Sequence, residues 1–154
     1  MRVQRIMCPV DFSESSTAAL DDAASLAHQL GAQLLIVHVD EHPSSTDAAS
    51  SPFSCQAGAR RSLLERMAPR VNGVRFEHHF VHGIPGDEIP RFAQLHDVDL
   101  VVMGHHNAAE RLHYRYDGVC DMVSRECKCP VMTVRHAVEH PPWVRIDGDG
   151  WSPV

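Results

Sequence analysis

The sequence Asp-Leu-Val-Val-Met-Gly (99–104) decides the fold of this chain. Its four apolar residues form a short continuous run that ends at Gly104, which is typical of a strand buried on both faces of a parallel sheet. The polar segment 105–117 follows, and a helical pattern then leads into a second apolar strand at 131–135. A strand that ends at a glycine and passes through a loop into a helix is the usual architecture of a phosphate site. This segment therefore predicts both an α/β fold and the place of a ligand.

The same alternation of strand and helix extends back to the start of the chain. Residues 5–10 are predicted as the first strand, and Ser13 as the N-cap of a helix that stops at Gly31. Residues 33–39 follow as a second buried strand. Small alanines on the apolar face indicate a helix lying close to the sheet. The predicted inward face of this helix consists of Ala19, Ala23, Leu26, Ala27 and Leu30.

The middle of the chain continues the pattern. Residues 40–53 are rich in Ser, Pro, Ala and Asp and predict a surface loop. A second helix should end near Pro69, and the alternation over 74–81 indicates a strand near a sheet edge. A third helix tolerates Pro90 only if that proline falls in its first turn. The residues predicted to face the core from the later helices are Leu63, Leu64 and Met67, then Ile89, Phe92, Ala93 and His96, then Val119, Met122 and Val123.

The element order is therefore β-α-β-α-β-α-β-α-β without an internal repeat. This order predicts an α/β three-layer sandwich built on a five-stranded parallel sheet. At 154 residues the chain fits one domain, which we place at 1–136. Residues 137–154 are predicted as a C-terminal extension that forms no regular helix, and its two tryptophans could clamp onto a partner.

Composition limits the classes of partner. The formal net charge is −6, which argues against nucleic acid or an anionic membrane, because both require clustered Lys and Arg. No apolar run approaches the ~20 residues of a membrane span. The first residues enter a strand without a signal-peptide core, which predicts a cytoplasmic protein. The five cysteines are scattered and odd in number, so reduced thiols are expected.

Together these residues resemble a universal stress protein domain over roughly residues 2–136. The resemblance implies a Rossmann-like fold of the adenine-nucleotide alpha hydrolase type and a role in the stress response. Three segments carry it, namely Ile-Met-Cys-Pro-Val-Asp-Phe-Ser (6–13), Gly-Ala-Gln-Leu (31–34) leading into His38 and Val39, and residues 99–104 together with Cys-Pro-Val (129–131).

The phosphate motif of the family is altered in this chain. Members that bind nucleotide carry Gly, two residues, Gly, nine residues, Gly and then Ser or Thr. Here Gly104 keeps the first position, but Asn107, Asp117 and Gly118 occupy the other three. Asn107 can partly imitate glycine because it tolerates the left-handed region. Asp117, expected as the N-cap of the fourth helix, would compete for the N–H groups that a phosphate needs and add a like charge. Such a contact at ~4 Å costs about 4 kcal/mol at an effective dielectric of ~20.

The sequence therefore predicts that ATP is not bound, as in the branch of the family that lacks nucleotide binding. The adenosine half of the pocket is better kept, since by resemblance Pro9, Val10 and Asp11 would contact base and ribose. Val39 would offer backbone hydrogen bonds, with Met103 nearby. An AMP-like ligand, or ATP itself, stays open as the alternative, as does a dry pocket in which Asp11 only leads into the helix. The candidate cofactor-binding residues are Pro9, Val10, Asp11, Val39, Met103, Gly104, Asn107, Asp117, Gly118 and Val119.

Two further sets of side chains are given structural roles. His105 and His106 follow a strand adjacent to Cys8, but they lack the spacing typical of zinc ligands, so no metal site is predicted. Cys127 should lie at a helix C-terminus and Cys129 should be buried, and both positions disfavour a thiolate. No catalytic residue is assigned, and we expect no enzyme activity beyond, at most, weak nucleotide hydrolysis.

The strand at 131–135 should form a sheet edge that is too apolar to leave open to water. Members of the family commonly pair this strand with its own copy across a two-fold axis, so the resemblance implies a homodimer. The sequence thus favours a non-catalytic dimeric stress-response module with unknown protein partners. The alternative is an ATP- or AMP-binding stress sensor of the same fold.

Overall fold

The computed structural model describes residues 2–41, 52–105, 118–135, 143–146 and 150–153. Its elements alternate as the sequence predicts, from a first strand to a fifth through four helices. A short antiparallel pair of strands follows them. The elements are β1 (Arg5–Pro9), α1 (Glu14–Leu30), β2 (Gln33–Asp40), α2 (Pro52–Arg66), β3 (Phe76–His82), α3 (Pro85–Leu95), β4 (Leu100–His105), α5 (Val119–Glu126), β5 (Val131–Arg135), β6 (Trp143–Ile146) and β7 (Gly150–Pro153).

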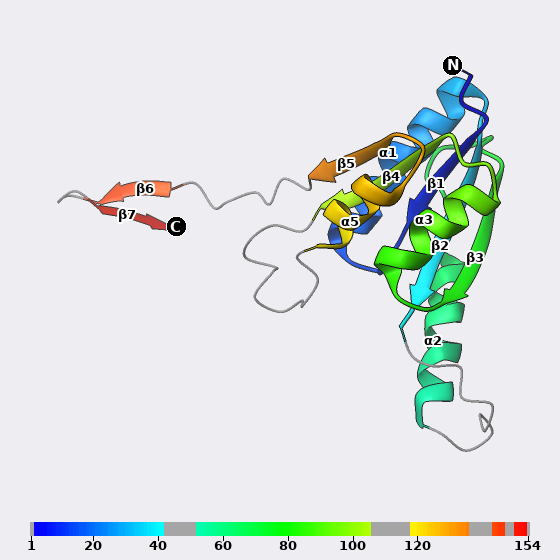
Figure 1. The fold of residues 1–154 in the computed structure, drawn as a ribbon. Coiled ribbons are helices and arrows are strands. Elements are labelled where there is room, and N and C mark those ends of the chain that lie inside the picture. The colour runs from blue at the N-terminus through cyan, green and yellow to red at the C-terminus, as the bar shows by residue number, and fades with distance from the viewer. Residues whose placement is uncertain (1, 42–51, 106–117, 136–142, 147–149, 154) are drawn as a thin grey trace.

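The first five strands form one parallel sheet in the order β3-β2-β1-β4-β5 (Figure 1). This order equals the first five positions of the doubly wound dinucleotide fold, in which the chain reverses its winding between the first and fourth strands. The predicted α/β class, the five-stranded parallel sheet and the edge positions of β3 and β5 are confirmed.

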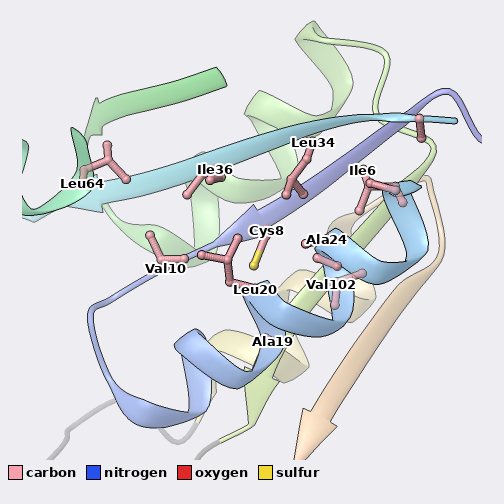
Figure 2. Packing of buried hydrophobic residues seen from close by; sticks show 13 residues of the cluster. Ile6, Cys8, Val10, Ala19, Leu20, Ala24, Leu34, Ile36, Leu64 and Val102 are labelled. Carbon is pink, nitrogen blue, oxygen red and sulfur yellow. The ribbon is translucent and has the colours of Figure 1, made fainter. Parts of the chain in front are cut away.

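Helices cover both faces of the sheet and create two apolar cores. Figure 1 shows α3 and α5 in front of the sheet and α1 behind it. Figure 2 shows Cys8 of β1 and Ile36 of β2 on the same side as Ala19, Leu20 and Ala24 of α1. Because strand side chains alternate, the intervening residues fill the second core beneath α3 and α5. Residues of that second core include Met7, Leu35, Val37, Val39, Ile89, Phe92, Val101, Met103 and Val123.

Helix α1 begins and ends at the residues that the sequence predicts. The Ser13 side chain accepts a hydrogen bond from the N–H of Ser16 at 3.2 Å, which satisfies one of the free N–H groups of the first turn. Gly31 takes the left-handed conformation, with φ 64°, that usually ends a helix. Leu30, however, is 51% exposed, so its predicted inward position was wrong. The packed part of the helix ends at Ala27, and the last turn extends beyond it.

Three other helical predictions need correction. Leu64 is buried but Leu63 is 47% exposed, because consecutive helical residues point about 100° apart and only one of them faces the sheet. Met122 is likewise 38% exposed. Helix α3 begins at Pro85, so Pro90 lies inside the helix rather than in its first turn. Pro90 has no N–H and therefore leaves the carbonyl of Gly86 without its helical donor.

The boundaries of the predicted loop at 40–53 also shift. Strand β2 extends through Asp40, and helix α2 starts at Pro52. Within the predicted extension, β6 and β7 pair antiparallel, with Trp143 opposite Pro153. The two strands are therefore joined to each other, and none of the described residues of the extension is helical.

A carboxylate joins β1 to β4 at the amino end of the sheet. Asp99 Oδ2 accepts hydrogen bonds from the N–H groups of Gln4 and Arg5 at 2.7 and 2.9 Å. The N–H of Asp99 in turn donates to the carbonyl of Arg5 at 3.0 Å. The side chain thus satisfies backbone donors at the start of β1, before the parallel ladder begins.

We predict that Asp99→Ala lowers the free energy of unfolding by about 1.5–3 kcal/mol, because it removes a charged acceptor from two backbone donors. Urea denaturation followed by circular dichroism measures this loss. The matched control is Asp22→Ala on the exposed face of α1, which should change the same quantity by no more than about 0.5 kcal/mol. Equal losses in the two variants would contradict the role assigned to Asp99.

Candidate functional site

The candidate site lies where the winding of the sheet reverses. Strands β1 and β4 are neighbours, with Met7 opposite Val101, but the helices that follow them, α1 and α5, pack on opposite faces. A crevice forms beyond the carboxyl ends of two such strands, and open α/β sheets bind their ligands there. The sequence-predicted residues Pro9, Val10, Met103 and Gly104 all lie at these two strand ends.

Strand β1 ends before β2 does, so the last residues of β2 have no β1 residue opposite them. The β1–β2 ladder ends with Pro9 opposite Val37, and the N–H of Val10 donates to the carbonyl of Val37 at 2.8 Å. Backbone groups two residues apart face the same neighbour. The N–H and C=O of Val39 therefore face the side that β1 occupied before it ended. They offer one donor and one acceptor at the place where the resemblance puts the base.

The apolar residues of the predicted site are buried by the protein itself. Val10, Val39 and Met103 are 4, 9 and 5% exposed and belong to the two cores. Their side chains therefore pack within the protein, which leaves only backbone groups of these residues as candidate contacts to a ligand.

Asp11 belongs to the turn that leads into α1. Its Oδ1 accepts hydrogen bonds from the N–H and the hydroxyl of Ser13 at 3.1 and 2.5 Å. Its own N–H donates to the hydroxyl of Ser16 at 3.4 Å. Phe12, between them, has φ 67°, a left-handed conformation that side chains rarely adopt. Asp11 is nonetheless exposed, so it orders the turn and also presents a carboxylate to solvent.

Gly104 is required by packing, whatever ligand is bound. A Cβ added to Gly104 would lie 2.5 Å from the carbonyl oxygen of Ser15 and 2.8 Å from the nitrogen of Ser16. The end of β4 therefore lies directly against the first turn of α1. This backbone contact explains the glycine independently of the phosphate role that the resemblance implies.

Helix α5 brings its N-terminus to the same strand end. The thiol of Cys120 donates to the carbonyl of Gly104 at 3.4 Å, and Val119, the first helical residue, is half-buried. The N-cap is Gly118, without a side-chain cap hydrogen bond. The expectation that Asp117 is the N-cap was therefore wrong by one residue, because Asp117 precedes the helix. Asn107 and Asp117 lie outside the described residues.

Two residues of this region were missed by the sequence reasoning. Asp121 is an acidic residue in the first turn of α5 and adds negative charge at the helix N-terminus, where a phosphate would bind. The exact start of the helix was needed to recognise it. His38 is buried and its Nδ1 lies 2.7 Å from the carbonyl oxygen of Val10. A histidine inside an otherwise apolar strand was the available signal.

The thiols of Cys8, Cys127 and Cys129 are not activated. Burial raises the pKa of the Cys8 thiol, and burial together with the neighbouring Cys129 thiol raises the pKa of Cys127 to about 11. Burial also raises the pKa of Cys129, although that residue is only half-buried, and the prediction of a buried Cys129 was therefore wrong. All three pKa shifts favour the neutral thiol, which is the less nucleophilic form.

No group of three or more His, Cys, Asp or Glu residues is arranged to hold a metal ion within the part of the chain that the structure describes. None of the helices in that part is both long and apolar enough to cross a bilayer.

A hollow of about 450 Å³ lies between α3 and α5. Charges of both signs line it, so it selects neither an anion nor a cation. Its lining residues are Gly86, Asp87, Pro90, Arg91, Gln94, Met122, Arg125 and Glu126.

Comparison with known proteins decides the family. The model of the Universal stress protein family matches residues 2–135. This chain belongs to the universal stress protein family. The predicted family membership is thus confirmed, while the loss of ATP binding that the altered phosphate motif implies remains a prediction.

Named relatives cover most of this universal stress protein. Universal stress protein MJ0531 of Methanocaldococcus jannaschii is 25% identical over 140 residues, which are 86% of this chain and 82% of the relative. Universal stress protein YxiE of Bacillus subtilis is 26% identical over 145 residues, 85% of this chain and 98% of the relative.

Solved structures share the fold. The structure of MJ0577 has a TM-score of 0.68 at 22% identity and covers 88% of this chain and 98% of its own. A universal stress protein in complex with cAMP has a TM-score of 0.58 at 22% identity, with coverages of 88 and 98%. A universal stress protein from Archaeoglobus fulgidus in complex with dAMP has a TM-score of 0.61 at 21% identity, with coverages of 86 and 98%.

We predict that Gly104→Ala lowers the free energy of unfolding by about 1–3 kcal/mol, because the new methyl group would overlap the backbone of α1. Urea denaturation without nucleotide measures the loss. Gly58→Ala in α2 is the control, since a Cβ there meets nothing within 4 Å, and alanine favours a helix relative to glycine. An unchanged Gly104→Ala protein would show that the glycine is not needed for packing.

Proposed function

We propose that this universal stress protein is a non-catalytic, dimeric module that binds an adenine mononucleotide in preference to ATP. The observation that supports the proposal is that the N–H and C=O of Val39 lie beyond the last residue of β1 that pairs with β2. Adenine presents an N–H donor beside a ring-nitrogen acceptor. One backbone C=O and one N–H complement this pair without help from a side chain.

The ligands of two neighbours agree with this class of ligand. The structures solved with cAMP and with dAMP contain adenine mononucleotides, and both proteins share the fold of this chain. Asp11 is exposed at the adjacent turn, where its carboxylate could accept a hydrogen bond from a ribose hydroxyl.

Charge and motif disfavour a longer phosphate chain. The motif positions after Gly104 hold Asn107, Asp117 and Gly118, and Asp121 lies in the first turn of α5. Asp117 and Asp121 thus bracket the helix start in the sequence, where free N–H groups would otherwise attract an anion. A mononucleotide carries fewer charges toward this end than ATP does.

The proposed dimer uses the edge of β5, with a second copy of this chain as its occupant. In the described residues β5 pairs only with β4, so its other side presents unpaired backbone groups. Met132 is 37% exposed, and Val131 and Val134 are half-buried. A strand of this kind can pair with its own copy across a two-fold axis.

We predict that AMP and cAMP bind at least about tenfold more tightly than Mg-ATP in isothermal titration calorimetry, since roughly 1.4 kcal/mol of unfavourable charge suffices for that ratio. The double variant Asp117→Gly/Gly118→Ser should bind Mg-ATP more tightly and so reduce the affinity difference between Mg-ATP and the two mononucleotides. A Cβ at Gly118 meets nothing within 4 Å, and serine is a good N-cap. Variant and wild type should bind cAMP alike.

Two results would contradict this proposal. Tight Mg-ATP binding by the wild type, or stoichiometric ATP released from the purified and denatured protein, would show that the altered loop still holds a triphosphate. Absence of binding by AMP and cAMP would remove the mononucleotide function and leave a module that works through protein contacts.

We predict that Met132→Asp converts the dimer to a monomer in size-exclusion chromatography with light scattering, because each copy would then place an unpaired carboxylate against the apolar edge of the other. Leu95→Asp is the matched control, since Leu95 is 69% exposed on α3 and away from β5. A dimer that persists in Met132→Asp would exclude β5 as the interface.

A further inference from the structure

His38 lies beneath the turn that ends β1. The residue is 7% exposed, and its ring is enclosed by Phe12 of the turn and Phe80 of β3. Ring centroids are 4.5 Å apart for Phe12 and 5.5 Å apart for Phe80. The Arg61 guanidinium of α2 lies over the Phe80 ring at 4.7 Å from its centroid. The imidazole thus lies between two tilted aromatic rings, one from the turn and one from β3.

The hydrogen bond of His38 determines its tautomer. Nδ1 lies 2.7 Å from the carbonyl oxygen of Val10. A carbonyl can only accept, so Nδ1 carries the proton and the neutral ring leaves Nε2 as an acceptor. Nε2 is buried and has no hydrogen-bond partner among the described residues. A second proton would therefore create a buried charged donor without an acceptor in that part of the chain.

Charged groups surround the ring from three elements. Asp40 lies two residues along β2, and Asp11 lies in the turn; both favour the protonated ring. Arg60 of α2, which pairs with Asp40 at 3.0 Å, opposes it. Burial lowers the pKa of His38 and outweighs the hydrogen bond to Val10 and the two carboxylates, which raise it, so the ring is neutral at neutral pH.

We propose that His38 is a positioning residue of the adenine site, which holds the turn 10–13 while its ring is neutral and releases the turn when the ring gains a proton. The turn contains Asp11, and because the chain turns away after Val10, the N–H and C=O of Val39 lie beyond the last pairing of β1 with β2. Holding this turn therefore preserves both polar features of the site. The proposal deepens, and for its effect on ligand binding rests on, the mononucleotide function proposed above.

Protonation and turn opening are linked. In the opened turn the ring regains its ordinary pKa of about 6.5, whereas in the closed turn its pKa is lower. The closed turn therefore binds fewer protons than the opened turn. Its stability relative to the opened turn decreases as the pH falls below about 6.5. Between pH 7.5 and 5.5 the opening equilibrium rises by at most about tenfold.

The first measurement is hydrogen exchange by NMR at the amides of Val10, Asp11 and Ser13. Protection factors, which correct for the intrinsic pH dependence of exchange, should fall by several-fold up to about tenfold from pH 7.5 to 5.5. His38→Asn keeps a donor near the Nδ1 position but does not titrate, so its protection factors should not change with pH. His38→Phe keeps a ring but leaves the carbonyl of Val10 without its donor, so its protection factors should be low at both pH values.

The second measurement is cAMP affinity at pH 7.5 by calorimetry. The single phosphodiester of cAMP keeps its charge over this pH range, unlike the phosphate of AMP, whose second pKa is about 6. His38→Phe should weaken cAMP binding by about fivefold, the effect of one hydrogen bond, and His38→Asn should bind more tightly than His38→Phe. His28→Gln is the control, because His28 is exposed at the end of α1, and it should match the wild type in both measurements.

The outcomes separate the two proposals. Wild-type protection factors that do not change with pH, or that change equally in His38→Asn, would overturn the role of His38 in holding the turn. Wild-type cAMP binding that His38→Phe leaves unchanged would overturn the positioning role while the mononucleotide function stands. Absence of cAMP binding by the wild type would overturn the mononucleotide function, and the exchange profile would still decide whether His38 holds the turn.

Discussion

The close contact between the first turn of α1 and the end of β4 is the constraint on which the rest of this structure depends. Only hydrogen fits at Gly104, because the backbone of Ser15 occupies the space of a side chain. The contact sets the height of α1 above the sheet, and small alanines continue the same close approach along the helix. Since α1 follows β1 at the edge of the sheet where β4 ends, this contact also fixes how the ends of β1 and β4 lie relative to the helix.

The two parts of the proposed mononucleotide site differ in physical character. At the base half, the protein offers backbone groups on Val39 and a turn ordered by Asp11 and His38. At the phosphate half, helix α5 begins at a glycine N-cap with an acidic residue in its first turn. The proposed preference for a small adenine ligand rests on this difference. The same division explains why the family resemblance alone could not choose among ATP, a mononucleotide and an empty pocket.

Sequence patterns located the strands well because buried parallel strands are continuous apolar runs bounded by glycine and polar residues. Helix caps were predictable for the same local reason, as Ser13 and Gly31 demonstrate. Predictions failed where the answer depended on neighbours distant in sequence. Leu30, Leu63 and Met122 have the spacing of core residues, but their exposure depends on where the sheet and the adjacent helices end. Pro90 was misplaced because the first residue of α3 could not be read from periodicity.

The sequence by itself determined the α/β class, the order of the elements, the family and the altered phosphate motif. Each of these depends on local patterns of polarity and residue type. Tertiary structure alone decided that Gly104 packs against α1, that the β1 ladder ends below Val39, and that His38 donates to Val10. These facts join residues that are far apart along the chain. Their distances depend on how helices and strands pack, and no local pattern contains that information.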